Sequence, residues 1–128
     1  MTYEKIVEKA FTYKGYQCYV VFLPIGWRCG YVGISSGKGI KPAEEYNNIL
    51  CHGGITYNES TCPIPGVSVS DFWWIGFDCA HYGDGVDLDS CVKYYGQSHF
   101  VLPMPGNIRT EEYCENELKF IVDQLEEA

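Results

Sequence analysis

The sequence predicts an α+β fold, with a mostly antiparallel sheet packed against an N-terminal and a C-terminal amphipathic helix. Apolar residues recur at helical spacing at both ends of the chain. The strand-like runs between these ends do not alternate with helices, as they would in a parallel sheet. We expect a single α+β domain over residues 1–128, because this length is typical of one domain.

The two expected helices differ in how their ends are marked. The first follows Thr2 and ends at Gly15, and the apolar positions within it are Tyr3, Ile6, Val7, Ala10 and Phe11. The last follows Thr110, whose hydroxyl suits an N-cap, and it carries an apolar stripe that includes Leu118 and Ile121. Both stripes are expected to face the sheet.

Four segments have the composition of strands. Residues 17–23 and 27–35 are β-branched and aromatic, with a tight connection at 24–26 between them. Shorter strands are expected at 54–59 and 72–79. A short helical segment around 43–50, a proline-containing loop at 60–70 and a long excursion over 82–109, with a small helix near 88–95, complete the pattern.

Alternation separates the two faces of the predicted strands. In 72–79, the side chains directed at the helices are expected to be Trp73, Ile75, Phe77 and Cys79. The opposite face carries Trp74, Gly76 and Asp78, and Gly76 either leaves a slot beside the indole or accommodates a large neighbouring side chain. In 27–35, Trp27, Cys29, Tyr31 and Gly33 share a face. If the face that carries Trp74 and Asp78 meets the face that carries Trp27 and Tyr31, the two form an aromatic cleft with an acid at one end.

Bulk composition limits the possible partners. The net charge of −8 argues against general nucleic-acid binding. The seven cysteines include no C-x-x-C pair and the first residues lack an apolar signal core, so we expect free thiols in a reducing cytoplasm. No apolar run is long enough to span a membrane. The aromatic content of 16% exceeds what a small core needs, which suits a homo-oligomer.

Two short runs concentrate the reactive side chains. His52, Gly53 and Gly54 open one run, and consecutive glycines can expose backbone N–H groups to an anion. The second run, 73–84, contains Asp78 and His81. Arg28 and Arg109, the only arginines, are candidate anion clamps, and a flexible Lys38 could approach a phosphate although its glycine loop lacks phosphate-loop spacing.

Three motifs resemble a family of small proteins found in phages, prophages and some bacteria. They are GYV at 30–32, HGGITY at 52–57 and WWIGFDCAHYGD at 73–84, and the family pattern is GYV, HGG[LI]TY and WW[LI]GFDCAHxGD. The stretch after Gly33 departs from that pattern, which has a proline and a histidine there. The resemblance implies a phage-like origin and shared site residues, and it implies no particular activity.

The leading hypothesis is a phage-like accessory protein, with a possible anti-defence role, that sequesters a small nucleotide-like ligand without turning it over. Aromatic rings would stack on the base, His52 and neighbouring donors would hold phosphate, and carboxylates would accept hydrogen bonds. The predicted ligand-binding residues are Arg28, Tyr31, His52, Gly53, Gly54, Thr56, Tyr57, Trp74, Asp78, His81 and Asp84. No cofactor is expected.

Two other function classes remain open. One is a metal-dependent or acid–base hydrolase acting on a nucleotide, with His52, Asp78 and His81 as catalytic residues. A zinc ion in that enzyme would take its ligands from His52, Asp78, Cys79 and His81, although their spacing fits no standard zinc motif. The other is an inhibitor whose acidic surface blocks a basic cleft of a host defence enzyme.

Overall fold

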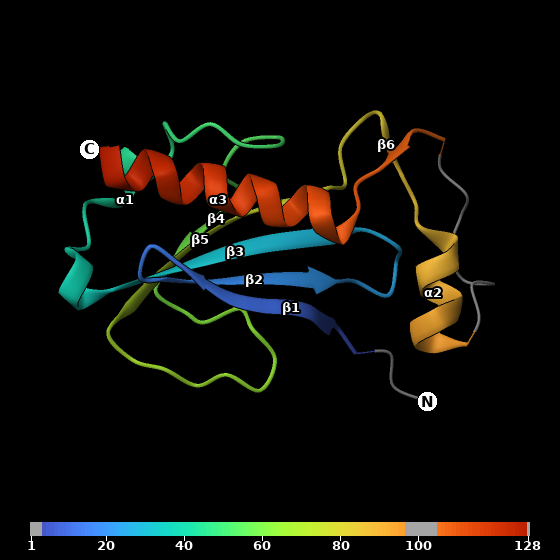
Figure 1. The fold of residues 1–128 in the computed structure, drawn as a ribbon, viewed down its shortest axis with the longest axis horizontal. Coiled ribbons are helices and arrows are strands. Elements are labelled where there is room, and N and C mark those ends of the chain that lie inside the picture. Colours follow the sequence, from blue (N-terminus) through green and yellow to red (C-terminus); the bar gives the residue numbers. More distant parts are fainter. Residues whose placement is uncertain (1–3, 97–104, 128) are drawn as a thin grey trace.

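The computed structural model describes residues 4–96 and 105–127, and within them it is an α+β fold. A five-stranded antiparallel sheet has the order β1-β2-β3-β5-β4. Its strands are β1 (Ile6–Tyr13), β2 (Tyr16–Phe22), β3 (Arg28–Ser35), β4 (Tyr57–Glu59) and β5 (Phe72–Asp78). The long helix α3 (Glu111–Glu127) lies across one face of this sheet (Figure 1). The mostly antiparallel sheet and the C-terminal helix are therefore confirmed.

The expected N-terminal helix is wrong, because residues 6–13 form strand β1. They pair with β2 through the two-residue turn Lys14–Gly15, whose φ angles of 50° and 84° are those of a tight hairpin turn. A register shift between Val7 and Lys9 interrupts the alternation of side chains along the strand. That irregularity gives the segment an apolar spacing that resembles a helix.

The core on the α3 side of the sheet follows the predicted alternation. Side chains of β3 and β5 that pack there include Val32, Ile34, Ile75 and Phe77. They meet the buried stripe of α3, which consists of Cys114, Leu118, Ile121 and Val122. The Thr110 hydroxyl accepts a hydrogen bond from the backbone N–H of Tyr113, as expected of an N-cap.

A second core lies on the opposite face, where the 60–71 segment covers the sheet. Trp74, Tyr31 and Cys29 are buried there with Ile64 from that segment. Three aromatic residues of the paired strands β3 and β5 lie directly opposite glycines: Tyr31 faces Gly76, Phe77 faces Gly30 and Trp74 faces Gly33. A Cβ at any of these glycines would collide with the opposing ring, so the glycines provide space for it. Of the two alternatives at Gly76, the structure shows the large neighbouring side chain, which is Tyr31.

The long excursion forms a small second unit of structure beside the end of the sheet. It contains β6 (Asp84–Gly85), α2 (Leu88–Tyr95) and β7 (Asn107–Ile108), and residues 97–104 lie outside the described part. The strands β6 and β7 pair in parallel, which places Arg109 beside Asp84. The remaining elements are a 3₁₀ turn (Ser36–Lys38) and the short helix α1 (Ala43–Tyr46). No described helix has the length and apolarity that a bilayer crossing requires.

Candidate functional site

A polar cluster forms where β5 ends and α3 begins. We call it the Asp84 cluster, and its members are His52, Asp78, His81, Asp84, Arg109 and Tyr113. They come from the loop before β4, the end of β5 and the loop after it, β6, the residue after β7 and the start of α3. Both sequence runs that carried the motifs therefore meet in space, as the site hypothesis required.

Asp84 is the centre of this cluster. Its carboxylate accepts hydrogen bonds from Arg109 Nε at 2.8 Å, from His52 Nε2 at 2.8 Å and from the backbone N–H of His81 at 3.1 Å. Burial acts to raise the pKa of Asp84, but these hydrogen bonds outweigh it and lower the pKa below its ordinary value of 3.8. Asp84 is therefore an ionised, almost fully buried carboxylate that ties three segments together.

His52 connects Asp84 to α3. Its Nδ1 lies 2.8 Å from the Tyr113 hydroxyl, and its backbone N–H donates to Glu117 Oε1 at 2.8 Å. A carboxylate of the chain thus takes the backbone N–H of His52, and Cys51 O takes that of Gly54 at 3.0 Å, so neither group is available to the predicted phosphate.

His81 fills the space that Gly53 leaves. A Cβ at Gly53 would overlap the His81 ring, and the φ of 70° at Gly53 also favours glycine. The His81 and His52 rings lie edge to face, with centroids 5.9 Å apart. Asp78 Oδ1 lies 3.2 Å from His81 Nε2, a close ion-pair contact without hydrogen-bond geometry. His52 and Asp78 thus belong to one cluster, connected through His81.

A cleft of about 510 Å³ opens beside this cluster. Its described lining consists of Trp27, Ala80, His81, Tyr82, Gly83, Asp84, Pro105 and Gly106. Tyr82 is fully exposed, and the buried indole Nε1–H of Trp27 has no partner in the described part of the chain. A smaller pocket of about 220 Å³ lies between α1 and the end of α3 and contains no predicted site residue.

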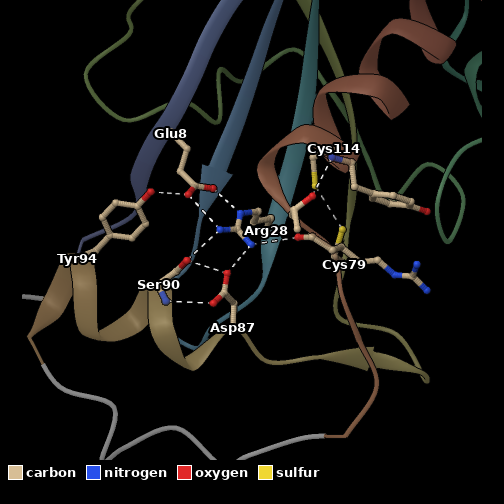
Figure 2. Close-up of polar contacts among 10 residues, drawn as sticks. Glu8, Arg28, Cys79, Asp87, Ser90, Tyr94 and Cys114 are labelled. Carbon is tan, nitrogen blue, oxygen red and sulfur yellow. Dashed lines mark hydrogen bonds and ion pairs between the residues drawn. The ribbon is translucent and has the colours of Figure 1, made fainter.

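Arg28 cannot act as the predicted anion clamp. Its guanidinium is buried, and all of its N–H groups are used by Glu8, Asp87, Ser90 and the backbone oxygen of Arg109. Figure 2 shows this arrangement, in which Tyr94 of α2 also donates to Glu8. A guanidinium with every donor occupied has none left for a ligand. Arg28 instead anchors α2 to the sheet.

Arg109 differs from Arg28, because part of its guanidinium has no partner among the described residues. Its Nε is bound to Asp84, and within residues 4–96 and 105–127 no partner is recorded for its two terminal amino groups. Its guanidinium carbon lies 5.1 Å from the centre of the Tyr113 ring. The sequence named both arginines, and only the fold distinguishes between them.

The predicted stacking residues lie away from this cleft. Trp74 and Tyr31 are buried in the second core, and Tyr57 meets the Tyr31 ring edge-on at 5.5 Å. Thr56 extends the sheet, since its backbone N–H donates to Gly76 O at 2.9 Å. Of the aromatic residues, Trp27 and Tyr82 line the cleft instead. The sequence analysis placed Trp27 on the face of the predicted aromatic cleft but did not include it among the ligand-binding residues, and it did not single out Tyr82, although Tyr82 stands inside the longest motif.

The described residues contain no disulfide and no group of side chains arranged as a metal site. All seven cysteines are free thiols. Cys79 and Cys114 lie in contact at 3.7 Å in the core, and their hydrogen bond, together with burial, strongly raises the pKa of Cys79 (Figure 2). No group of three or more histidine, cysteine, aspartate or glutamate side chains there is arranged to hold a metal, so the predicted zinc ligands do not converge.

Comparisons of this chain with protein-family models, with curated proteins and with solved structures each found no match. The fold and the cluster therefore provide the evidence for function. They define an α+β protein with an aromatic cleft beside a buried aspartate–histidine–tyrosine network.

Proposed function

We propose that the protein is a small-molecule binder that holds a nucleotide-like ligand in the cleft between Trp27 and Tyr82. The observation that carries the proposal is the cleft itself, whose 510 Å³ falls in the range of small-molecule sites. Its lining combines aromatic rings with a few polar groups, which is the usual composition of such sites.

The groups around the cleft suit a planar, anionic ligand. Tyr82 is an exposed ring on which a base can stack, and such stacking contributes about 1–3 kcal/mol per base. His81 and Asp84 line the same cleft, and Arg109 binds Asp84 through its Nε. The terminal amino groups of Arg109 have no partner among the described residues, and such a guanidinium can bind a phosphate through two hydrogen bonds.

The motif resemblance supports a phage-like origin for this binder. A small protein that takes up a nucleotide signal lowers the free concentration of that signal, so capture would be consistent with an anti-defence role. The net charge of −8 argues that the ligand is a single small anion held locally and not a nucleic-acid strand.

Thermal unfolding with a panel of linear and cyclic nucleotides tests this proposal. A ligand at 100 times its dissociation constant should stabilise the protein by about 2.7 kcal/mol. The Tyr82→Ala variant should lose most of this stabilisation. The matched control Phe120→Ala removes an exposed aromatic ring from the outer face of α3 and should retain it. The proposal fails if no nucleotide changes the unfolding temperature, or if both variants respond like the parent protein.

A further inference from the structure

Two apolar side chains are exposed where the loop before β4 meets α3. One is Leu50, whose side chain is 68% exposed, the largest fraction among the described valine, leucine and isoleucine residues. The other is Phe120 of α3, which is 45% exposed. Single exposed apolar residues are common on protein surfaces, whereas neighbouring ones mark an interaction surface.

The hydrogen bonds of Gln124 show that these two residues are neighbours. Its Nε2 donates to the backbone oxygen of Leu50 at 2.7 Å and to that of Phe120 at 3.2 Å. Its Oε1 accepts a hydrogen bond from the backbone N–H of Leu50 at 2.8 Å. Gln124 therefore holds both backbone groups of Leu50 against α3, while the side chain of Leu50 remains in solvent.

The residues on either side of Leu50 are fixed as well. The backbone N–H of His52 donates to Glu117 Oε1 at 2.8 Å, and that of Ile49 donates to the backbone oxygen of Tyr46 at 3.2 Å. A side chain presented on a fixed backbone loses little conformational entropy when it binds a partner. The loop is thus organised for binding before any partner arrives.

A pocket of about 220 Å³ adjoins Leu50, between α1 and the C-terminal end of α3 (Figure 1). Gln124 forms part of its wall, and Tyr46, Ile49 and Leu125 give it an apolar lining. This volume is below the roughly 300–1,000 Å³ of small-molecule sites, so the pocket suits one apolar side chain of a larger partner. We call Leu50, Phe120 and this pocket the Leu50 surface.

The charged residues around the Leu50 surface are mostly acidic. Glu44 and Glu45 lie on α1, and Glu127 lies about one turn beyond Gln124 on α3. All three are exposed, and none has an ion-pair partner within residues 4–96 and 105–127. Lys41 is the cation at the pocket. Two copies of the chain meeting through this surface would place these carboxylates against one another, and a nucleic acid or an anionic membrane would be repelled.

We propose that the Leu50 surface docks a basic partner protein. The partner inserts an apolar side chain into the pocket, covers Leu50 and Phe120, and pairs its lysine or arginine side chains with Glu45 and Glu127. An amphipathic helix with a positively charged polar face has this chemistry, since its apolar stripe presents side chains at i, i+3, i+4 and i+7. The inference is independent of nucleotide binding, because the pocket of the Leu50 surface and the cleft share no lining residue.

A synthetic amphipathic helix of leucine and lysine, about 14 residues long, is a probe with this chemistry. Fluorescence anisotropy of the labelled peptide, titrated with the full chain, measures the dissociation constant. One reference peptide carries glutamate in place of every lysine, and a second has the same composition as the probe but no apolar stripe. We expect only the leucine–lysine helix to bind, and its affinity should fall as the salt concentration rises.

Two variants locate the binding site. Leu50→Ser removes the apolar contact without disturbing the fold, because the side chain is in solvent and the backbone bonds to Gln124 remain. We expect it to weaken binding of the probe by about 10-fold. Reversing two charges together, with Glu45→Lys and Glu127→Lys, should also weaken binding by about 10-fold and should reduce its salt dependence.

The matched controls are Val92→Ser and Asp89→Lys, which change an exposed apolar residue and an exposed acid of α2 and should bind the probe like the parent protein. The inference is overturned if the probe does not bind, if either reference peptide binds equally, or if both variants of the Leu50 surface keep the parent affinity. Sedimentation of the chain alone tests self-association, and a dimer that Leu50→Ser dissociates would identify a second copy as the occupant and also overturn it. Tyr82→Ala should bind the probe normally, so a failure of nucleotide binding leaves this result unchanged.

Discussion

Replacing Arg28 with methionine should be among the most destabilising changes at the interface between α2 and the sheet. The side chains of Arg28 and Glu8 are 6% and 5% exposed, and Asp87 is 14% exposed. Methionine fills much of the same volume but leaves both carboxylates without their cation. Breaking a buried ion pair by removing one partner costs about 3–5 kcal/mol.

Urea unfolding measures this loss directly. With a denaturant slope of about 2 kcal/mol per M, a loss of about 4 kcal/mol lowers the midpoint by about 2 M. The control is Lys9→Met, which removes the cation of a solvent-exposed ion pair with Glu115 and should change the midpoint little. Adding Glu8→Gln to Arg28→Met should recover part of the loss, because one unpaired charge is then neutral. A midpoint for Arg28→Met close to that of Lys9→Met would refute the reasoning.

Three further predictions concern the core and the pH dependence of stability. Gly76→Ala should destabilise by about 1–3 kcal/mol in urea unfolding, because its Cβ would meet a backbone oxygen and the Tyr31 ring, whereas a Cβ at Gly37 would make only an ordinary contact with Ser35 Oγ at 3.9 Å, so Gly37→Ala should be neutral. Leu118→Ala should cost about 3–5 kcal/mol by the same measurement, since its side chain is fully buried between α3 and the sheet. The lowered pKa of Asp84 means that the unfolded chain protonates first as the pH falls. Its contribution is present above pH 3.8 and disappears as the pH drops to the lower folded-state pKa, so Asp84→Asn should flatten the acid limb of the stability curve. An acid limb of unchanged steepness in that variant would contradict this account.

The helix at the chain end and the strand faces were predictable because local periodicity determines them. The stripe through Leu118 and Ile121 repeats at helical spacing, and the alternation through Trp73 and Ile75 repeats every second residue. The error at residues 6–13 has the opposite origin. A short amphipathic segment fits both periods when a bulge interrupts the strand, and pairing with β2 decides between them.

The candidate site was predictable in its members but not in its connections. The motif runs supplied His52, Asp78, His81 and Asp84, and the structure brings these four together. Nothing in the sequence indicated that the Tyr113 hydroxyl would form a hydrogen bond with the imidazole of His52, because 61 residues separate them. A sequence shows which groups donate and accept, whereas the fold decides which of them meet.

The sequence by itself determined the α+β class, the direction in which the faces of strands β3 and β5 point and the residue types gathered in the motifs. These follow from interactions between residues that are near one another in the chain. Only the tertiary structure decided that Arg28 is fully paired inside the protein and that Arg109 instead binds Asp84 through its Nε. The reason is that a buried donor must find an acceptor, and which carboxylate supplies it depends on how distant segments pack.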